Sequence, residues 1–403
     1  MSEARWLSIV GLGEDGIDGL SPAARRLVAQ AAFIVGGKRH LSLIGTVAAE
    51  TLAWPSPIEE AFDAIEARRG SPVCVLASGD PFFFGIGSTL MRRFSPDEMV
   101  CAPAPSAFSL AASRLGWAQQ DCALLSLHGR PLEAIIPHLR PGARILALSW
   151  DDATPAKLAA LLAERGFGRS KLTVCEAMGG PRERIRASKV QSFALDNVAA
   201  LNTIALEVAA DRRARILPQV AGLPDDWFEH DGQITKRDVR AITLAALAPE
   251  SGETLWDVGA GSGSVAIEWM LADPANRAVA IEAREDRAAR IVRNSLNFGV
   301  PGLAVTRGEA PHVFHDLPEP NAIFIGGGAS APTMIERAVD ALPSGGRLVV
   351  NAVTLETQAA CVGWRAHWGG ELVQVAVAHA EPVGRFSGWR VTMPIAQWRW
   401  VKP

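Results

Sequence analysis

Residues 254–263 have the sequence TLWDVGAGSG, and this stretch decides the fold of the second half of the chain. A short apolar run ends at Asp257, three glycines then alternate with small residues, and residues 265–268 open a helical pattern. Glycine can adopt a positive φ, which lets the backbone approach a ligand closely. The free N–H groups at the start of the next helix would face that ligand. The stretch therefore predicts a strand, a tight ligand-binding turn and the start of a helix.

An acidic residue follows the glycine turn at a distance typical of a nucleoside site. Glu282 ends another apolar run, Ala278–Ile281, 23 positions after Gly259. A carboxylate there can accept hydrogen bonds from both hydroxyl groups of a ribose. The spacing is G-x-G-x-G rather than the dinucleotide G-x-G-x-x-G, so we expect adenosine without a pyrophosphate; the alternative is an ordinary turn that binds nothing. The predicted contacts are Asp257, Gly259, Gly261, Ser262, Gly263 and Glu282.

The composition indicates a globular protein with two or three domains. Of the 403 residues, 48% are hydrophobic and 21% are charged, and the formal net charge is −3. Without a basic excess we expect no nucleic-acid partner, and the Arg212–Arg215 cluster is interpreted as a solvated linker. The five cysteines lack a C-x-x-C pair, which favours buried thiols in a reducing compartment over a metal site. With no signal peptide and no apolar run of about 18 residues, we expect a cytoplasmic protein without a membrane partner.

Strands, turns and helices alternate along the chain, which predicts an α/β fold. The fully apolar run Val73–Ala77 is typical of a strand buried on both faces of a parallel sheet. Ser21 and Ser106 are the predicted N-caps of two helices in the first half. An Arg-, Pro- and Asp-rich stretch separates the halves. The predicted parts are residues 1–112 and 113–210 as two subdomains of a first domain, 211–231 as a linker, and 232–403 as a second domain.

The second half is predicted to form one seven-stranded Rossmann-like domain, with ligand loops at the carboxyl ends of its strands. Its first helix is expected to begin with Thr235 as the N-cap and Asp238 at the third helical position, a weak capping box. Near the end of the chain, Leu372–His379 and Trp389–Met393 are predicted as strands, and Trp398 and Trp400 are expected to pack a final strand.

Four motifs of the first half resemble the tetrapyrrole methylase family, which uses S-adenosylmethionine. They are Val10–Gly13, Ala77–Phe82, Pro105–Ser106 and Asn202–Leu206. Residues 126–130 and 174–185 further resemble the branch that methylates precorrin-6 intermediates of cobalamin synthesis. The resemblance implies a class III methyltransferase fold of two subdomains. The implied cofactor contacts are Gly11, Gly13, Gly79, Asp80, Pro81, Phe82, Ser106, Leu127, His128 and Met178.

Some of these residues have a second interpretation. Asp80 either binds the cofactor or caps its own turn, and His128 either contacts the cofactor or is a hydrogen-bonded loop residue. Three arginines alternate along one predicted strand and so share a face. They either pair with substrate carboxylates or are surface charges that pair with neighbouring glutamates. These arginines are Arg182, Arg184 and Arg186.

Residues 226–403 resemble the precorrin methyltransferases of the same pathway, which implies a class I methyltransferase fold. The motifs that carry this resemblance are 231–240, 257–268 and 325–327. Glu268, on the predicted first helix after the turn, is interpreted as a partly buried structural acid, with a cofactor contact as the alternative. Glycines after two further strands are also expected to contact the cofactor. They are Gly308, Gly326 and Gly327.

The two halves, in this order, resemble the bifunctional decarboxylating methyltransferases of cobalamin synthesis. The resemblance implies two S-adenosylmethionine sites and a precorrin-6Y-type tetrapyrrole substrate. It also implies that the first half methylates carbon 5, while the second methylates carbon 15 and removes the ring C acetate carboxyl to give precorrin-8. Methyl transfer needs mainly proximity and exclusion of water, whereas decarboxylation also needs a proton donor. The candidate catalytic residues, near predicted loop ends that face the cofactor, are Thr235, Lys236, Glu309 and His312.

Other functions stay open at this point. The second half could methylate RNA or protein beside a non-catalytic first half, although the absence of a basic face argues against RNA. One half could also be a cofactor-binding scaffold that presents substrate. By resemblance to the tetrapyrrole methylases, we expect a homo-oligomer, and we expect no metal.

Overall fold

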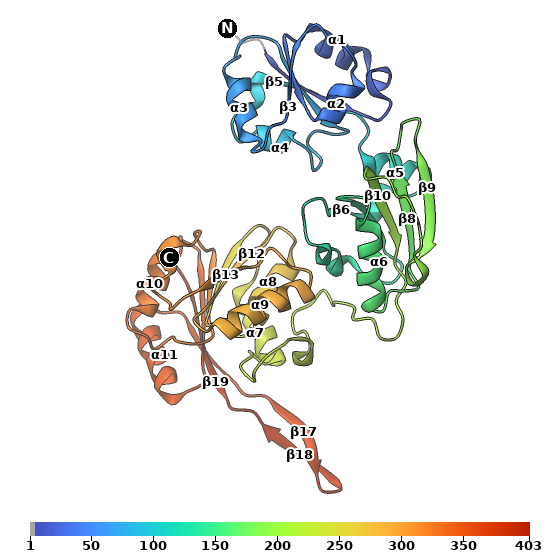
Figure 1. The fold of residues 1–403 in the computed structure, drawn as a ribbon. Coiled ribbons are helices and arrows are strands. Elements are labelled where there is room, and N and C mark those ends of the chain that lie inside the picture. The colour runs from blue at the N-terminus through green and yellow to red at the C-terminus, as the bar shows by residue number, and fades with distance from the viewer. Residues whose placement is uncertain (1–4) are drawn as a thin grey trace. The chain divides into compact units, whose positions relative to one another are not determined.

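The computed structural model describes residues 5–403, which divide into two compact units (Figure 1). The first unit extends to Leu132 and resumes over His138–Arg215, and the second comprises Glu133–Pro137 and Ile216–Pro403. Much of the stretch expected as a linker packs into the second unit, since Leu223 and Phe228 are buried there. The domain limits expected from the sequence therefore stay a prediction. Among residues 5–403, none of the helices is both long and apolar enough to cross a lipid bilayer.

The first unit begins with a five-stranded parallel sheet in the order β3-β2-β4-β1-β5. Every residue of β1 is buried, because helices cover both faces of this sheet. Helices α1 and α2 pack on one face, and α3 and α4 pack on the other. The strands are β1 Leu7–Leu12, β2 Phe33–Gly36, β3 Glu50–Ala53, β4 Val73–Ser78 and β5 Met99–Ala102; the helices are α1 Pro22–Gln30, α2 Lys38–Leu43, α3 Glu59–Glu66 and α4 Gly87–Leu90.

A second five-stranded sheet, of mixed direction, completes the first unit in the order β6-β7-β10-β8-β9. Strand β10 runs antiparallel to both of its neighbours, whereas β6 and β7 are parallel. Helix α5 packs on this sheet through Phe108 and Ala111. The elements are β6 Cys122–Ser126, β7 Arg144–Leu148, β8 Lys171–Glu176, β9 Arg184–Lys189, β10 Asn202–Glu207, α5 Ala107–Leu115 and α6 Thr154–Glu164.

The second unit contains the predicted seven-stranded sheet, in the order β13-β12-β11-β14-β15-β19-β16. The first five strands in that order are parallel, and β19 is antiparallel between β15 and β16. The α/β fold class and the Rossmann-like second half are thus confirmed. The elements are β11 Thr254–Val258, β12 Arg277–Glu282, β13 Ala304–Arg307, β14 Ala322–Ile325, β15 Arg347–Ala352, β16 Glu371–Val375, β19 Ile395–Val401, α7 Arg237–Leu247, α8 Ser264–Ala272, α9 Glu285–Asn297, α10 Met334–Ala341 and α11 Leu355–Trp368.

The end of the chain departs from the sequence prediction. Strand β16 ends at Val375, and a separate hairpin follows, formed by β17 Ala378–Val383 and β18 Phe386–Val391. The hairpin extends away from the seven-stranded sheet (Figure 1). The prediction of Trp389–Met393 as a strand of the sheet is wrong, because that position belongs to β19. The hairpin is not buried, since Trp389 is 78% exposed.

Helix starts were predictable where a hydroxyl side chain caps them. The Ser21 Oγ accepts a hydrogen bond from the Ala24 N–H at 3.2 Å, and the Ser106 Oγ accepts one from the Ser109 N–H at 3.1 Å, so both N-caps are confirmed. The capping box at Thr235 is wrong. Helix α7 begins one residue later than that box requires, with Lys236 at the N-cap position.

Candidate functional site

The glycine turn of the second unit joins β11 to α8 through three left-handed residues. Gly259, Gly261 and Gly263 have φ values of +70°, +60° and +75°. Residues that carry a side chain rarely adopt this left-handed backbone conformation, so the turn requires glycine at these positions. The Gly259 and Ala260 N–H groups donate to the Ile281 carbonyl oxygen at 3.0 and 3.2 Å, which fixes the turn to β12. The turn is therefore held against the neighbouring strand.

Glu282 lies directly beside this turn, at the end of β12. One carboxylate oxygen accepts a hydrogen bond from the Gly261 N–H at 2.9 Å, and the other accepts one from the Arg284 N–H at 3.0 Å. An ionised carboxylate has about four acceptor positions, so two remain for a ligand. The side chain is buried but reaches the turn that the motif predicted. This arrangement can hold the two hydroxyl groups of a ribose.

Asp257 and Ser262 lie beneath the turn rather than at its open side. The Asp257 carboxylate is buried and accepts a hydrogen bond from the Ala266 N–H, in the first turn of α8, at 3.0 Å. Burial raises the pKa of Asp257 to about 7, and the nearby charge of Glu282 adds to the shift. Ser262 is completely buried. Asp257 thus orients the helix start, and a direct cofactor contact through its side chain stays a prediction.

Two more strand ends bring their glycines to the same edge of the sheet. The Gly326 N–H donates to the Val258 carbonyl oxygen at 3.0 Å, and the Gly308 N–H donates to the Glu282 carbonyl oxygen at 3.2 Å. A Cβ added to Gly259 would lie 3.0 Å from the Gly327 backbone, so the two loops touch. The candidate ligand site of this unit is therefore surrounded by the carboxyl ends of four strands, β11, β12, β13 and β14. Open α/β sheets bind ligands at this edge.

The four predicted catalytic residues come from two different loops at this edge. The segment that contains Thr235 and Lys236 crosses the glycine turn, since a Cβ added to Gly261 would lie 3.2 Å from the Gln233 carbonyl oxygen. Glu309 and His312 follow Gly308, and the His312 N–H donates to the Glu309 carbonyl oxygen at 3.0 Å. Thr235 and Lys236 thus lie near the site on one loop, and Glu309 and His312 lie near it on another. The role of each residue stays a prediction.

Glu268 has the structural role that the sequence favoured. Its carboxylate is buried on α8 and pairs with the fully buried guanidinium of Arg240 at 2.6 Å. It also accepts hydrogen bonds from the Gly222 and Leu223 N–H groups at 2.6 and 2.9 Å. All of its close partners are protein groups that need a buried acceptor.

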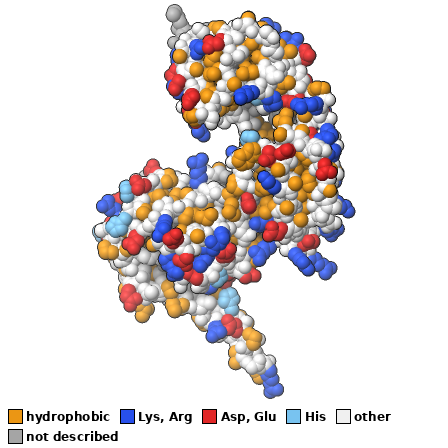
Figure 2. Space-filling view, viewed as in Figure 1, with side chains coloured by type: hydrophobic (Ala, Val, Ile, Leu, Met, Phe, Trp, Pro, Cys, Tyr) orange, Lys and Arg blue, Asp and Glu red, His pale blue; other side chains and the backbone are white. Residues whose placement is uncertain are grey.

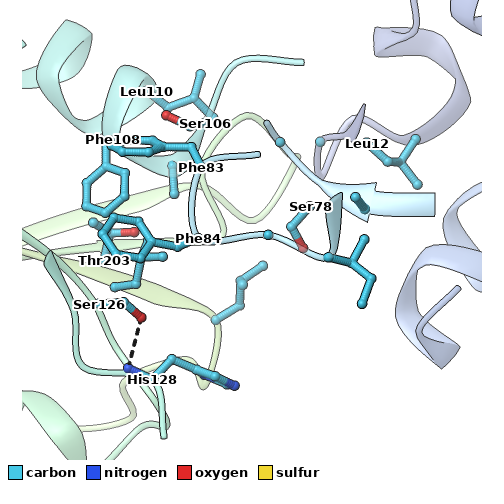
Figure 3. A pocket seen from close by; sticks show the side chains of 18 of the residues that line it. Leu12, Ser78, Phe83, Phe84, Ser106, Phe108, Leu110, Ser126, His128 and Thr203 are labelled. Carbon is cyan, nitrogen blue, oxygen red and sulfur yellow. Dashed lines mark hydrogen bonds between the residues drawn. The ribbon is translucent and has the colours of Figure 1, made fainter. Parts of the chain in front are cut away.

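The first unit contains a cavity of about 760 Å³, shown in Figure 3. Both sheets of the unit contribute to its wall, with Leu12 and Ser78 from one and Ser126 and Thr203 from the other. Small-molecule sites usually occupy about 300–1,000 Å³, so this volume suits a ligand of cofactor size. The cavity is therefore the candidate cofactor site of the first unit.

Half of the predicted contacts in this unit line the cavity. The lining residues among them are Gly13, Gly79, Ser106, His128 and Met178. Of the described residues, Gly11, Asp80, Pro81, Phe82 and Leu127 lie outside the cavity wall.

Three of the residues outside the wall, Gly11, Asp80 and Leu127, have local structural roles. A Cβ added to Gly11 would collide with the Gly79 carbonyl oxygen, so Gly11 permits close backbone packing. The Asp80 carboxylate accepts a hydrogen bond from the Phe82 N–H at 2.9 Å and thereby caps its own turn. Leu127 is completely buried. These positions shape the loop, and any direct contact with a cofactor stays a prediction.

Sequence reasoning missed two groups of cavity residues. Phe83 and Phe84 line the wall, and each ring lies within 6 Å of the Phe108 ring (Figure 3). A polar cluster forms another part, where the Ser78 Oγ lies 2.9 Å from both His40 Nε2 and Arg39 Nη2. Burial and the charge of Arg39 lower the pKa of His40 to about 4, so its imidazole is neutral at pH 7. The polar cluster joins residues 38 and 39 positions apart, so no local motif marks it, whereas Phe83 and Phe84 directly follow the Ala77–Phe82 motif.

The three alternating arginines are largely accounted for by pairing within the chain. Arg184 and Arg186 both contact the buried carboxylate of Glu176, at 2.6 and 3.0 Å. Their pairing favours the interpretation of surface charges neutralised by glutamate. Arg182 is 80% exposed at its side chain and lies 3.6 Å from Glu14.

Comparisons with known proteins cover both units. The family model of tetrapyrrole (corrin/porphyrin) methylases matches residues 7–194, and that of the precorrin methyltransferase domain matches residues 226–402. A precorrin-6Y C(5,15)-methyltransferase [decarboxylating] of Sinorhizobium sp is 56% identical over 98% of this chain and 96% of its own length.

Two shorter relatives each match less than half of this chain. A cobalt-precorrin-7 C(5)-methyltransferase of Salmonella typhimurium is 32% identical over 47% of this chain and 94% of its own length. A probable cobalt-precorrin-6B C(15)-methyltransferase (decarboxylating) of Pyrobaculum calidifontis is 34% identical over 43% of this chain and 92% of its own length.

Proposed function

The chain belongs to the family of precorrin-6Y C(5,15)-methyltransferases (decarboxylating), and from this premise we propose that it holds two separate methyl-donor sites, one in each unit. It is an S-adenosylmethionine-dependent enzyme of cobalamin biosynthesis that methylates carbons 5 and 15 of precorrin-6Y and decarboxylates it. The observation that carries the two-site proposal is the presence of one candidate site in each unit: the cavity beside Gly79 and the turn beside Glu282. An acceptor such as RNA or protein is not favoured.

The names of the shorter relatives support a division of labour. One relative is named for carbon 5 alone, and the other for carbon 15 together with decarboxylation. We assign carbon 5 to the first unit, which matches the tetrapyrrole methylases, and the other two steps to the second unit.

The cavity of the first unit suits a flat substrate that has carboxylates around its edge. Phe83 and Phe84 offer apolar ring faces, while Arg92 and Arg130 also line the wall and Arg39 is paired with Glu14. Guanidinium groups bind carboxylates with paired hydrogen bonds. S-adenosylmethionine supplies an electrophilic methyl group, so these residues need only orient the nucleophilic carbon and exclude water.

The second unit must also handle a carboxylate and a proton. Glu282 would hold the ribose of the donor, and the backbone of the glycine turn would lie against its adenosine. Thr235 and Lys236 on one side, with Glu309 and His312 on the other, stay the candidates for orienting the departing carboxylate and returning a proton. A cytoplasmic location is also kept as a proposal, on the scattered cysteines of the sequence.

We further propose that the chain forms a homo-oligomer, and the β17–β18 hairpin supports this. Phe386 and Trp389 are 70% and 78% exposed, and Val383, Val391 and Met393 are also exposed. Figure 2 shows hydrophobic side chains along this arm. A lone two-stranded hairpin is marginally stable in water, and such apolar surface usually marks an interface. A second copy of the chain would cover it.

Counting bound product tests the two-site proposal directly. Native mass spectrometry of the full chain with S-adenosylhomocysteine should show two molecules per chain. A single bound molecule at saturation would overturn the two-site proposal, while the family assignment would stand. The same spectra without ligand report the oligomeric state, and a monomer at micromolar concentration would contradict the proposed oligomer.

A further inference from the structure

The segment that precedes α7, residues 222–236, lies across the glycine turn of the second unit, and we call it the strap. It begins in a buried anchor, where Glu268 of α8 accepts the Gly222 and Leu223 N–H groups. Arg240 adds hydrogen bonds to the Asp225 carboxylate at 3.0 Å and to the Thr235 carbonyl oxygen at 2.5 Å. The two ends of the strap are therefore fixed to α7 and α8.

A single buried amide joins the middle of the strap to the turn itself. Asn294 of α9 accepts the Glu229 N–H at 2.9 Å and donates to the Glu229 carbonyl oxygen at 3.0 Å. Its amide nitrogen also donates to the Ser262 carbonyl oxygen at 2.8 Å. The strap and the turn consequently share α9 as their common support.

Asp231 forms the last attachment before the strap reaches the turn. One of its carboxylate oxygens contacts Arg287 at 2.9 Å and Arg290 at 3.4 Å, both on α9. The other accepts the Gln233 N–H at 3.1 Å. The hydrogen bond from Arg287, with that from Gln233, holds the pKa of Asp231 well below its usual range. The carboxylate is thus ionised and bonded to both the helix and the strap.

Gln233 is the residue that this attachment places over the turn. Its carbonyl oxygen would lie 3.2 Å from a Cβ added to Gly261. Gly261 in turn donates to Glu282, the expected ribose acceptor. A short chain of contacts therefore runs from α9 through Asp231 and Gln233 to the turn.

We infer that Asp231 is a positioning residue for the methyl-donor site of the second unit, acting through Gln233 and the arginines of α9. The inference rests on the proposed function, because it assumes that the donor binds at this turn. With Asp231 in place, the strap forms one fixed wall of that site and carries Thr235 and Lys236. Without it, the wall would move while the sheet beneath stays intact.

Hydrogen exchange measured on the full chain with S-adenosylhomocysteine tests the inference at both sites in the same sample. Protection of residues 257–263 reports the second unit, and protection of residues 77–84 reports the first. Asp231→Ala should raise the ligand concentration needed to protect residues 257–263 by about tenfold, as expected for a lost charged hydrogen bond. Asp231→Asn keeps an acceptor for Gln233 and should lose less, about threefold. Protection of residues 77–84 should not change.

Glu229→Ala is the control, because it removes a second ion pair between the strap and α9, one that is more exposed than the Asp231–Arg287 pair. The Glu229 carboxylate contacts Arg293 at 2.8 Å, and both side chains are more than half exposed. Its backbone bonds to Asn294 would persist. Equal protection curves for Asp231→Ala and Glu229→Ala would overturn the inference. If the unaltered chain shows no protection at residues 257–263, the proposed function of the second unit fails instead.

Discussion

The two units form their candidate sites from glycine turns in different ways. In the second unit, the turn at Gly259–Gly263 is supported by the next strand of the same parallel sheet and by Glu282 at its end. In the first unit, Gly79 packs against Pro105 and Ser106, and the second sheet supplies much of the cavity wall. A site made from adjacent strand ends is marked by one continuous motif and a nearby acid, whereas the site assembled from two sheets is marked only by several short, separate motifs.

The strongest test of this comparison is Gly261→Arg in the second unit. Gly261 has φ +60°, and its open side faces the Gln233 carbonyl oxygen, so a side chain would be strained and would fill the site. We expect the rates of methylation at carbon 15 and of decarboxylation to fall roughly 100-fold, because a small misplacement of the reacting groups can cost about that factor. The product mass should then show one added methyl group and no loss of carbon dioxide. Loss of both methylations in a folded protein would contradict the separation of the two sites.

The corresponding change in the first unit is Gly79→Ala, which should have a smaller effect. Gly79 has φ +54°, and an added Cβ would lie 2.9 Å from the Ser106 Cα. Strain of about 1–3 kcal/mol should weaken donor binding in the cavity about tenfold. Single-turnover methylation at carbon 5 measures this, with decarboxylation as the internal control. An equal loss in both reactions would show that the two sites depend on each other.

Asp257, which lies beneath the glycine turn of the second unit, should make the stability of that unit depend on pH in a way that the first unit does not share. The folded-state pKa of Asp257 is raised to about 7, so folded chains bind more protons than unfolded ones between about pH 4 and pH 7. The contribution of Asp257 to the free energy of unfolding therefore falls as pH rises through that range. Asp257→Asn removes this titration, so its stability relative to the unaltered chain should increase as pH rises from about 4 to about 7, by up to about 1.4 kcal/mol for each pKa unit of the shift.

Urea unfolding near pH 5 and near pH 8, followed by hydrogen exchange of β11, measures this difference. The β1 strand of the first unit serves as the control, and its stability should be the same in both proteins. A constant difference at the two pH values would mean that Asp257 titrates normally in the fold.

The smallest expected effect concerns the turn after Gly79. Asp80 accepts the Phe82 N–H, and an asparagine oxygen can do the same. Asp80→Asn should therefore change the KM for S-adenosylmethionine in carbon 5 methylation by less than about twofold, within the scatter of surface substitutions. A larger change would support a direct cofactor contact through the carboxylate. It would also make the first site more similar to the second, where the carboxylate of Glu282 is expected to bind the methyl donor.

Site residues could be predicted from the sequence where the signals that mark them lie close together along the chain. The Asp257 and Glu282 positions were predictable because strand, turn and helix signals lie within about thirty residues of one another. The residues of the buried Arg240–Glu268 pair lie only 28 positions apart but had no comparable signal, because both residues stand inside helices and neither ends a strand or belongs to a glycine turn. Phe83 and Phe84 directly follow the Ala77–Phe82 motif, but nothing in the motif shows that their rings meet Phe108 in a cavity wall. Contacts between distant elements depend on the packing of whole sheets, which periodicity does not describe.

The hairpin shows a different reason for failure. Its alternating apolar residues satisfy the pattern of a half-buried strand. In the described chain these residues are exposed, because the hairpin leaves the sheet and β19 takes the position beside β15. The alternation of apolar residues predicts that one face of a strand is buried, but it does not identify the surface against which that face packs.

The buried Arg240 has a practical consequence for dividing the enzyme into separate halves. The precorrin methyltransferase model begins at residue 226, which suggests a natural cutting point. A truncation there would remove Asp225 and the Leu223 carbonyl oxygen from the guanidinium, and two N–H donors from Glu268. Each buried polar group left without a partner costs about 1–3 kcal/mol. An autonomous second half should therefore begin before Gly222, so that the ion pair keeps its full set of partners.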